Sequence, residues 1–573
     1  MSELIIKQET ASMYTRDRIK LDADIYRPDT DERLPVLLMR QPYGRAIAST
    51  VVYAHPRWYA ARGYIVVIQD VRGRGTSEGE FELFAREIED GFDTVNWASG
   101  LPGSTGEVGM YGFSYQGMTQ LYAAVDRPDA LKVLCPSMIA YDLYTDWAYE
   151  NGAFCLQANL GWAIQLAAET ARLRGDEAAF EQLYAASRNL PLGDPALRVL
   201  PHRLPASPAL LKELAPDSFY HSWLAHPYPG EYWEKLSPKT LIQNVDLPML
   251  HVGGWFDPYL RGTLNLYKEM ATRSKYPQHL IVGPWAHLPW GCKLGAVDYG
   301  IEAASPIDEA QIRWFDYFLK GKDTGIDRES PVCLFEMGSD RWRYFDSFPD
   351  REQKIYYLAS DGLANMREDG GMLWEYEEET EPESLPPGDS NPFEENEREF
   401  TNTIDILVHD PWRAVPALGG HAAFPGGSFD RSLLDCRSDI LTYTSPPLDE
   451  DLHIAGEVIV VVYCSADTPS FDLCAVLSEV HTNGRAYNFT QGYIRVDSEQ
   501  VPIQIPLQAT CTRIAKGNCL RLSLSAACFP AYPVNPGNGK LPGETRLIEA
   551  QIITLTVKSG QNYPSQIQLS VVV

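Results

Sequence analysis

The chain has 573 residues, too many for one ordinary hydrophobic core, so we expect two to four domains. Its composition, with 45% hydrophobic and 22% charged residues, is that of a soluble globular protein. The formal net charge of −28 repels phosphate backbones and anionic membranes, which argues against nucleic-acid binding.

Targeting signals are missing from the sequence. The first residues lack the basic and apolar regions of a signal peptide, and no run approaches the roughly 18 apolar residues of a membrane span. The ten cysteines are scattered and form no CxxC pair. We therefore expect a cytoplasmic protein with reduced cysteines and no membrane association.

The first part of the chain, 1–141, alternates strand-like and helix-like segments. Nearly unbroken apolar runs are typical of parallel strands that are buried on both faces, and they occupy residues 34–39, 64–68, 108–111 and 131–134. Amphipathic runs between them predict helices at 90–98 and 116–125. This alternation indicates a βα sheet.

The pattern changes at 142–240, which is rich in Ala, Leu, Trp, Glu and Arg at helical spacing and shows no clear strand. Strands resume at 247–252 and 279–282, within a segment that we assign to 241–352 and that also contains the predicted helices 263–273 and 309–319. A helical block inside a βα series is best explained as a cap over the carboxyl edge of the sheet.

The last part, 353–573, differs again. An acidic, proline-containing stretch at 375–399 predicts a solvated loop. Beyond it, short alternating segments predict strands at 454–462, 473–480, 486–496, 520–524 and 552–557. Many short strands separated by turns indicate an all-β sandwich such as a jelly roll. The predicted fold class is therefore α/β, an α/β core with an inserted helical cap and a C-terminal β domain.

Ser114 follows the strand 108–111 and precedes a predicted helix, in the sequence Gly-Phe-Ser-Tyr-Gln-Gly. A nucleophile elbow needs this strand–turn–helix context, because the tight turn lifts the hydroxyl clear of the sheet. The motif departs from the generic GxSxG, since position 116 is Gln116 and the second glycine is Gly117. A near-match of this kind also arises by chance.

Two further candidates follow strands in the same way. Asp257 comes after 247–252, and His287 comes after 279–282. Alone, the aspartate reads as a turn residue and the histidine as a structural one. Together with Ser114 they give the order serine, acid, histidine, which is that of the α/β-hydrolase triad.

An oxyanion hole would complete this site. The backbone N–H of Tyr115, directly after the serine, is the expected first donor. The hydroxyl of Tyr43 is a candidate second donor, with a packed loop aromatic as the equal alternative.

The glycine-rich stretch 70–79 resembles the dinucleotide-binding motif GxGxxG. That motif would need a glycine at position 78, where this chain has Glu78. A tight glycine turn with a structural arginine explains it better. No GxxxxGK[ST] loop and no zinc-type spacing occur, so we expect no cofactor and no metal.

Taken together, the motifs resemble the cocaine esterase group of the peptidase S15 (Xaa-Pro dipeptidyl-peptidase) family, nearly end to end. The resemblance rests on Tyr43 in its Pro-Tyr context, the 70–79 turn, the segment 89–94, the serine elbow, Gly254-Trp255-Phe256-Asp257, Gly283-Pro284-Trp285-x-His287 and Phe529-Pro530-x-Tyr532.

The resemblance implies an α/β-hydrolase core, a helical cap and a jelly roll. It also implies Ser114 as nucleophile, His287 as base, Asp257 as its orienting acid, and Tyr43 with Tyr115 as the oxyanion hole. By the same likeness an aromatic acyl pocket would form from Trp147, Trp162, Tyr259 and Phe424, although interface packing would explain each of them as well. A homodimer is plausible by analogy.

The expected function is hydrolysis of a small-molecule carboxylic ester or amide with a bulky apolar acyl group, through an acyl-enzyme. Alternatives are an Xaa-Pro dipeptidyl-peptidase, an α-amino-acid ester hydrolase or a glutaryl acylase. Those that recognise an amino terminus need carboxylates near the acyl pocket, for which the candidates are Glu150, Glu169 and Asp194. A non-catalytic binding protein with a degenerate hydrolase core is the remaining alternative.

Overall fold

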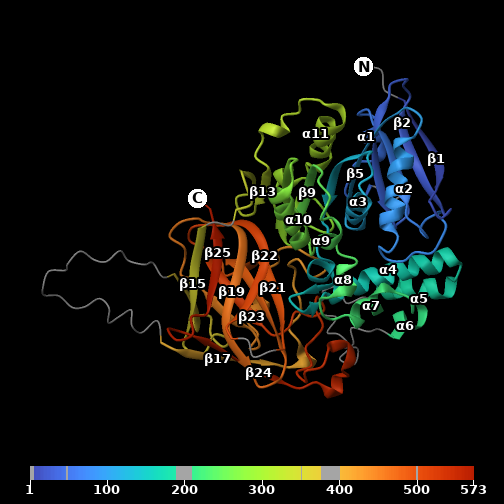
Figure 1. Ribbon diagram of the computed structural model, residues 1–573. Coiled ribbons are helices and arrows are strands. Elements are labelled where there is room, and N and C mark those ends of the chain that lie inside the picture. Colours follow the sequence, from blue (N-terminus) through green and yellow to red (C-terminus); the bar gives the residue numbers. More distant parts are fainter. Residues whose placement is uncertain are drawn as a thin grey trace.

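The computed structural model describes residues 5–46, 50–188, 209–349, 352–375, 401–497 and 501–572. Three parts are visible in Figure 1: a mixed α/β part (blue, then lime green), a group of helices beneath it (teal and green), and a β part (orange and red) at its side. No helix in these ranges is long and apolar enough to cross a membrane.

A 10-stranded sheet, in the order β1-β2-β4-β3-β5-β6-β9-β10-β13-β14, organises the α/β part. Its central strands pair in parallel. They are β4 (Ile65–Asp70), β3 (Leu34–Gln41), β5 (Ser104–Phe113), β6 (Leu131–Ser137), β9 (Met249–Phe256), β10 (Gln278–Ala286) and β13 (Val332–Glu336). These bounds confirm the strands predicted from apolar runs in this part.

Helices cover the sheet as the amphipathic runs predicted. They are α2 (Glu87–Ser99), α3 (Tyr115–Val125), α10 (Leu260–Arg273) and α11 (Ile307–Lys320), with the short α1 (Pro56–Ala60). Sequence reasoning missed both antiparallel edges, namely the hairpin of β1 (Ile6–Tyr14) and β2 (Lys20–Pro28), and β14 (Arg341–Phe345). In β2 the polar residues Asp22 and Asp24 are buried, so a search for apolar runs passes over this strand.

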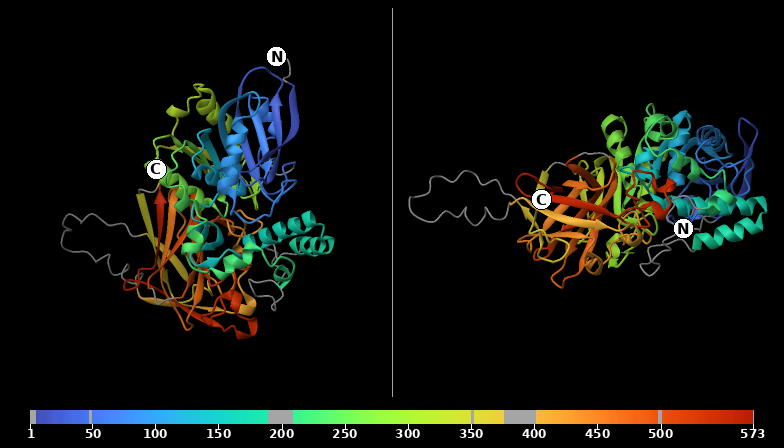
Figure 2. Two further views of the ribbon diagram at one scale, coloured as in Figure 1. Left: turned by 45° about the vertical axis from the view of Figure 1, so that its right-hand side comes forward. Right: turned by 90° about the horizontal axis from the view of Figure 1, so that it is seen from below.

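The helical segment between β6 and β9 lies beneath the α/β part, as predicted for a cap (Figure 1). It contains α4 (Leu156–Arg174), α5 (Glu177–Arg188), α6 (Ala209–Leu214), α7 (Phe219–Ala225), α8 (Glu231–Glu234) and α9 (Pro238–Leu241). The pair α4 and α5 projects sideways in both views of Figure 2. A π-helix, η2 (Tyr144–Ala148), and a two-stranded pair, β7 (Tyr149–Glu150) with β8 (Ala153–Phe154), precede α4. The expectation of no strand here is wrong for that short pair.

The last part is all β. Its 11-stranded sheet has the order β17-β24-β19-β25-β15-β16-β18-β23-β20-β21, with β22 paired to β19. The strands are β15 (Glu352–Ser360), β16 (Gly371–Glu375), β17 (Thr403–His409), β18 (Leu441–Thr444), β19 (Leu452–Ala466), β20 (Phe471–Val480), β21 (Ala486–Val496), β22 (Ile503–Ile514), β23 (Cys519–Ser525), β24 (Ile553–Ser559) and β25 (Gln566–Val571). All five strands predicted here are present. The predicted acidic loop falls almost wholly outside the described residues.

One hydrophobic cluster joins this β part to the core. It runs from Trp255 and Phe256 at the end of β9, through Leu264 of α10, into Leu507 and Ala509 of β22. Burial of apolar area of this kind is the main force that holds domains together. The carboxyl ends of β9 and β10, which carry the predicted acid and histidine, therefore lie at a packed domain junction.

Candidate active site

Ser114 occupies a strained turn between β5 and α3. Its backbone has φ 59° and ψ −128°, a conformation that non-glycine residues rarely adopt. The Ser114 N–H donates to the carbonyl of Ser137 at the end of β6, at 2.9 Å. The residue is 6% exposed. This is the strand–turn–helix geometry of a nucleophile elbow.

The position of the second glycine has a steric reason. A Cβ added to Gly117 would lie 2.3 Å from Ile139 Cγ2 and 2.9 Å from the Ser137 carbonyl oxygen. Gln116 is buried, and its Oε1 accepts from the Phe113 N–H at 3.4 Å. In this chain the residue that must approach β6 closely is therefore 117, which accounts for the departure from GxSxG.

Asp257 and His287 form a hydrogen-bonded pair. Asp257 Oδ1 lies 2.8 Å from His287 Nδ1. Asp257 is fully buried, and burial raises the pKa of its carboxyl while the hydrogen bond and charge of His287 oppose that rise. The peptide oxygen of Asp257 also accepts from Gln508 Nε2 of β22 at 3.1 Å, so the β domain helps to hold the acid.

The imidazole of His287 lies beside the elbow. Its ring centroid is 5.4 Å from that of Phe113, the residue before Ser114, and 4.9 Å from that of Tyr259. The three residues predicted from separate strand ends are thus brought to one place. The pairing through Nδ1 leaves Nε2 as the nitrogen available for the serine.

Tyr43 joins the same group, because its hydroxyl lies close enough to Ser114 for that serine to lower its pKa. Trp162 Nε1 donates to this hydroxyl at 3.1 Å. Burial raises the pKa of Tyr43 to about 12, against the hydrogen bond from Trp162 and the positive charge of Arg74. The phenol therefore keeps its proton and can act as a hydrogen-bond donor.

The backbone N–H of Tyr115 lies directly after Ser114, at the start of α3. Tyr115 is the first residue of α3, and the first N–H groups of a helix have no partner within the helix. Its side chain points elsewhere, since the hydroxyl donates to Glu87 Oε1 at 2.7 Å and the ring stacks on Phe84 at 4.8 Å.

An aromatic cluster surrounds these groups. Trp147 packs on Tyr259 at 4.2 Å and on Trp162 at 5.1 Å, so three of the four predicted pocket residues touch one another. Phe424 belongs to the β domain, and its N–H donates to Gln157 Oε1 of the cap helix α4 at 3.1 Å. Within the described residues its ring makes no contact with the other three rings. Sequence reasoning missed Phe84, which packs on Trp147 at 5.9 Å and carries no motif that could have revealed it.

The three carboxylates that were candidates to bind a substrate amino group lie in different surroundings. Glu150 is buried and neutralised by Arg261 Nη1 at 3.0 Å and His421 Nε2 at 2.9 Å, and its Oε2 also accepts from the Tyr532 hydroxyl. Glu169 pairs with Arg172 at 2.7 Å on the surface of α4. Asp194 lies outside the described residues.

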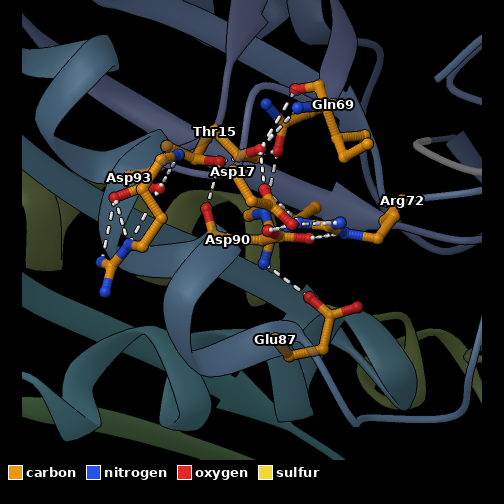
Figure 3. A network of polar contacts seen from close by, with 11 residues as sticks. Thr15, Asp17, Gln69, Arg72, Glu87, Asp90 and Asp93 are labelled. Carbon is orange, nitrogen blue, oxygen red and sulfur yellow. Dashed lines mark hydrogen bonds and ion pairs between the residues drawn. The ribbon is translucent and has the colours of Figure 1, made fainter. Parts of the chain in front are cut away.

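The turn at 70–79 has the predicted structural arginine. Arg72 reaches Asp17 at 2.7 Å and Asp90 at 2.7 Å, and Figure 3 shows its guanidinium between these carboxylates. Gly73 and Gly75 have φ +69° and +56°, and a Cβ on Gly75 would lie 2.0 Å from an Asp70 oxygen. The two glycines are therefore explained by the backbone conformation and close packing of the turn. In the described ranges no group of His, Cys, Asp and Glu is arranged to hold a metal ion.

Comparison with known proteins identifies relatives of this chain. The family model "X-Pro dipeptidyl-peptidase (S15 family)" matches residues 17–289, and the model of the X-Pro dipeptidyl-peptidase C-terminal non-catalytic domain matches residues 324–568. The cocaine esterase of Rhodococcus sp. (strain MB1 Bresler) is 30% identical, with 97% of each chain covered.

Solved structures show the same fold. A crystal structure of an aminopeptidase from the marine sediment archaeon Thaumarchaeota archaeon superimposes with a TM-score of 0.78 at 22% identity, covering 100% of this chain and 97% of that one. An α-amino acid ester hydrolase gives a TM-score of 0.75 at 21% identity, with the same coverage. The predicted α/β-hydrolase class, with a cap and a C-terminal all-β domain, is confirmed.

Proposed function

Because the chain belongs to the X-Pro dipeptidyl-peptidase (S15) family of serine hydrolases, we propose that it is an esterase acting through an acyl-enzyme. Its substrates would be carboxylic esters with a bulky apolar acyl group. One observation carries the proposal: the Asp257–His287 pair lies beside a strained Ser114, and the Tyr43 hydroxyl lies close to the same serine.

In the acylation step, Ser114 Oγ attacks the ester carbonyl carbon while His287 Nε2 takes the serine proton. Asp257 fixes the tautomer of the imidazole by accepting from Nδ1, and it stabilises the imidazolium that forms. The imidazolium then gives its proton to the leaving alcohol as the carbon–oxygen bond breaks. Water, deprotonated by His287, releases the acid and restores Ser114.

The negative charge that develops on the carbonyl oxygen would be met by two donors, the Tyr43 hydroxyl and the Tyr115 N–H. Trp162 supports this role for Tyr43. Because Trp162 Nε1 already donates to the phenol oxygen, the single proton of Tyr43 is free to point toward the reaction centre.

The aromatic walls support a bulky apolar acyl group. Trp147, Trp162 and Tyr259 form a contiguous surface that touches the ring of His287. Such rings exclude water from the acyl group and hold it by apolar contact.

The dipeptidyl-peptidase alternative needs a carboxylate for a free amino group. Glu150 is the predicted candidate nearest Trp147 in the chain, but Arg261, His421 and Tyr532 already occupy it. A carboxylate neutralised in this way is a poor partner for a second cation. This arrangement favours the esterase over an enzyme that reads an amino terminus.

The test compares wild type and Ser114→Ala on three substrates: an activated aryl ester, Gly-Pro-anilide and a β-lactam amide. We expect wild type to prefer the ester and the folded variant to lose nearly all ester hydrolysis. Retention of activity by Ser114→Ala would contradict the proposal. If wild type prefers Gly-Pro-anilide, the proposed esterase function is wrong and the dipeptidyl-peptidase function takes its place.

A further inference from the structure

The glycine turn at 70–79 carries two arginines in opposite situations. Arg72 is paired on both sides, with Asp17 and Asp90. Arg74 is 1% exposed, and no acidic side chain of the described residues lies within ion-pair distance of it. Its one hydrogen bond to protein runs from Nη1 to the carbonyl of Leu166, at 3.3 Å. Nε is buried without a partner.

An uncompensated buried cation is costly, because a charge removed from water needs an opposite charge or several hydrogen bonds. Burial does lower the pKa of Arg74, to about 10, which still leaves the guanidinium charged at neutral pH. The guanidinium carbon also lies 3.8 Å from the centroid of the Phe81 ring, over its face. A cation–π contact offsets part of the cost and holds the guanidinium plane in place.

Arg74 lines a cavity of about 1120 Å³ between the core and the cap helices α4 and α7. Acidic residues also line it, but two of them already have partners, Glu80 with Arg174 and Glu231 with Lys235. The remaining acidic residues on its wall are Glu82, Asp176 and Asp217. Arg74 is thus a buried cation on the cavity wall that has no ion-pair partner among the described residues, although the charge of Glu169 acts on it.

Trp162 links the cavity to the reaction centre, although the cavity wall contains none of the candidate catalytic residues. Trp162 donates to the Tyr43 hydroxyl on one side and packs on Phe219, a cavity wall residue, at 5.0 Å. Arg74 itself is close enough to Tyr43 for its charge to lower the pKa of that hydroxyl against the effect of burial. A substrate held at Ser114 could extend a polar end past Trp162 into this space.

We propose that Arg74 binds a carboxylate carried by the substrate, so that the preferred esters bear an acid group remote from the scissile carbonyl. The inference rests on the esterase function proposed above and deepens it. A guanidinium and a carboxylate form paired, charge-assisted hydrogen bonds, and Nε and Nη2 of Arg74 have no such partner within the described residues. The aromatic walls would take the apolar spacer between the two ends.

The experiment measures kcat/KM for p-nitrophenyl monoesters of dicarboxylic acids, from succinate to adipate, against the neutral methyl-capped ester of each. We expect wild type to prefer one acid-bearing ester over its neutral match by about tenfold or more, as a charged hydrogen bond supplies. Arg74→Met should abolish this preference by lowering kcat/KM for the acid-bearing ester far more than for its neutral match, while Arg74→Lys keeps part of it.

Arg174→Gln is the matched control, since Arg174 lines the same cavity but is exposed and paired with Glu80. It should keep the preference. An active wild type with no preference for any acid-bearing ester would overturn the inference. So would an equal loss by Arg74→Met on both esters of a pair, because a general electrostatic effect on the oxyanion would act on both alike.

A binding measurement separates this inference from the proposed function. Adipate should bind to Ser114→Ala, measured by calorimetry, and should bind at least about tenfold more weakly to Ser114→Ala/Arg74→Met. If wild type hydrolyses no ester but adipate binding depends on Arg74, the carboxylate site stands and the esterase function fails. If esters are hydrolysed but adipate binding does not depend on Arg74, the carboxylate site is wrong and the esterase function stands.

Discussion

At the scale of single residues, the proposed oxyanion hole depends on the direction in which the Tyr43 hydroxyl proton points. Tyr43 has one O–H, and its oxygen accepts from Trp162 Nε1 at 3.1 Å while Ser114 lies close to the same hydroxyl. A phenol whose acceptor side is occupied has fewer orientations for its own proton. In the proposed mechanism, Trp162 would therefore act on the oxyanion through Tyr43, as a positioning residue.

Tyr43→Phe should lower kcat on an aryl ester by about 10²–10³, because an oxyanion donor is lost while KM changes little. Trp162→Phe should lower kcat by a smaller factor, about tenfold, and should have no further effect in the Tyr43→Phe background. Steady-state kinetics of the two single variants and the double variant check this. Effects on kcat that multiply independently would show that Trp162 contributes only by its contact with the acyl group and not through Tyr43.

Buried arginines should differ in what their removal does to stability. Arg40 is fully buried and pairs with Glu87 at 2.6 Å, so Arg40→Met leaves that carboxylate without its cation and should cost about 3–5 kcal/mol. Arg74→Met removes an unpaired charge and should leave the free energy of unfolding nearly unchanged or increase it. Urea denaturation of both variants measures the difference. Equal losses would mean that Arg74 has a counter-charge in the folded chain.

At the scale of elements, the elbow depends on how closely α3 approaches β6. Gly117 lies in the first turn of α3, where alanine would ordinarily be favoured over glycine by about 1 kcal/mol. The contact with the Ser137 carbonyl reverses that preference.

Gly117→Ala should therefore both destabilise the protein and reduce ester hydrolysis at least about tenfold, since the turn that presents Ser114 has to shift. Gly291→Ala serves as the control, because a Cβ there meets nothing within 4 Å. Melting temperature and kcat/KM are measured for both variants. A Gly117→Ala protein with wild-type activity would show that the elbow tolerates a wider spacing.

The same elements show what sequence can predict. Ser114, Asp257 and His287 each follow a buried parallel strand, and because such strands end at one edge of the sheet, their order and placement predicted that they meet. Arg74 gave no such signal: its neighbour Arg72 has the same residue type in the same turn, and only tertiary contacts reveal which one is paired. The ion-pair and hydrogen-bond partners of Glu150 likewise lie 111 to 382 residues away in the chain, so no local sequence pattern could reveal them.

At the scale of the whole molecule, the reaction centre depends on contacts among three parts of the chain. Glu150 belongs to the segment that leads into the cap, Arg261 to the core helix α10, and His421 with Tyr532 to the β domain. Gln508 of β22 adds hydrogen bonds to the carbonyls of Trp255 and Asp257, at 2.8 and 3.1 Å. The β domain thus fixes the acid and the cap relative to the core.

This junction should make stability depend on pH. Burial alone would raise the pKa of Glu150, but the charges and hydrogen bonds of Arg261, His421 and Tyr532 outweigh it and hold the pKa well below its ordinary value of 4.5. A carboxylate with a depressed pKa adds stability that is complete above about pH 4.5 and is lost as the pH falls below that value.

Glu150→Gln should therefore be less stable than wild type at pH 7 by about 3–5 kcal/mol, since Arg261 would remain buried without its carboxylate. Between pH 5 and pH 3 its stability should fall less steeply than that of wild type. Denaturation at a series of pH values checks both points, with the exposed Glu329→Gln as control. Parallel pH curves for wild type and Glu150→Gln would contradict the linkage.

The most direct test of the account is covalent labelling of the folded protein with a fluorophosphonate, with the modified residue mapped by mass spectrometry. We expect a single rapid adduct on Ser114, formed much more slowly in the His287→Ala and Asp257→Asn variants. An adduct on another residue, or labelling of Ser114 at an unchanged rate in the His287→Ala protein, would contradict it.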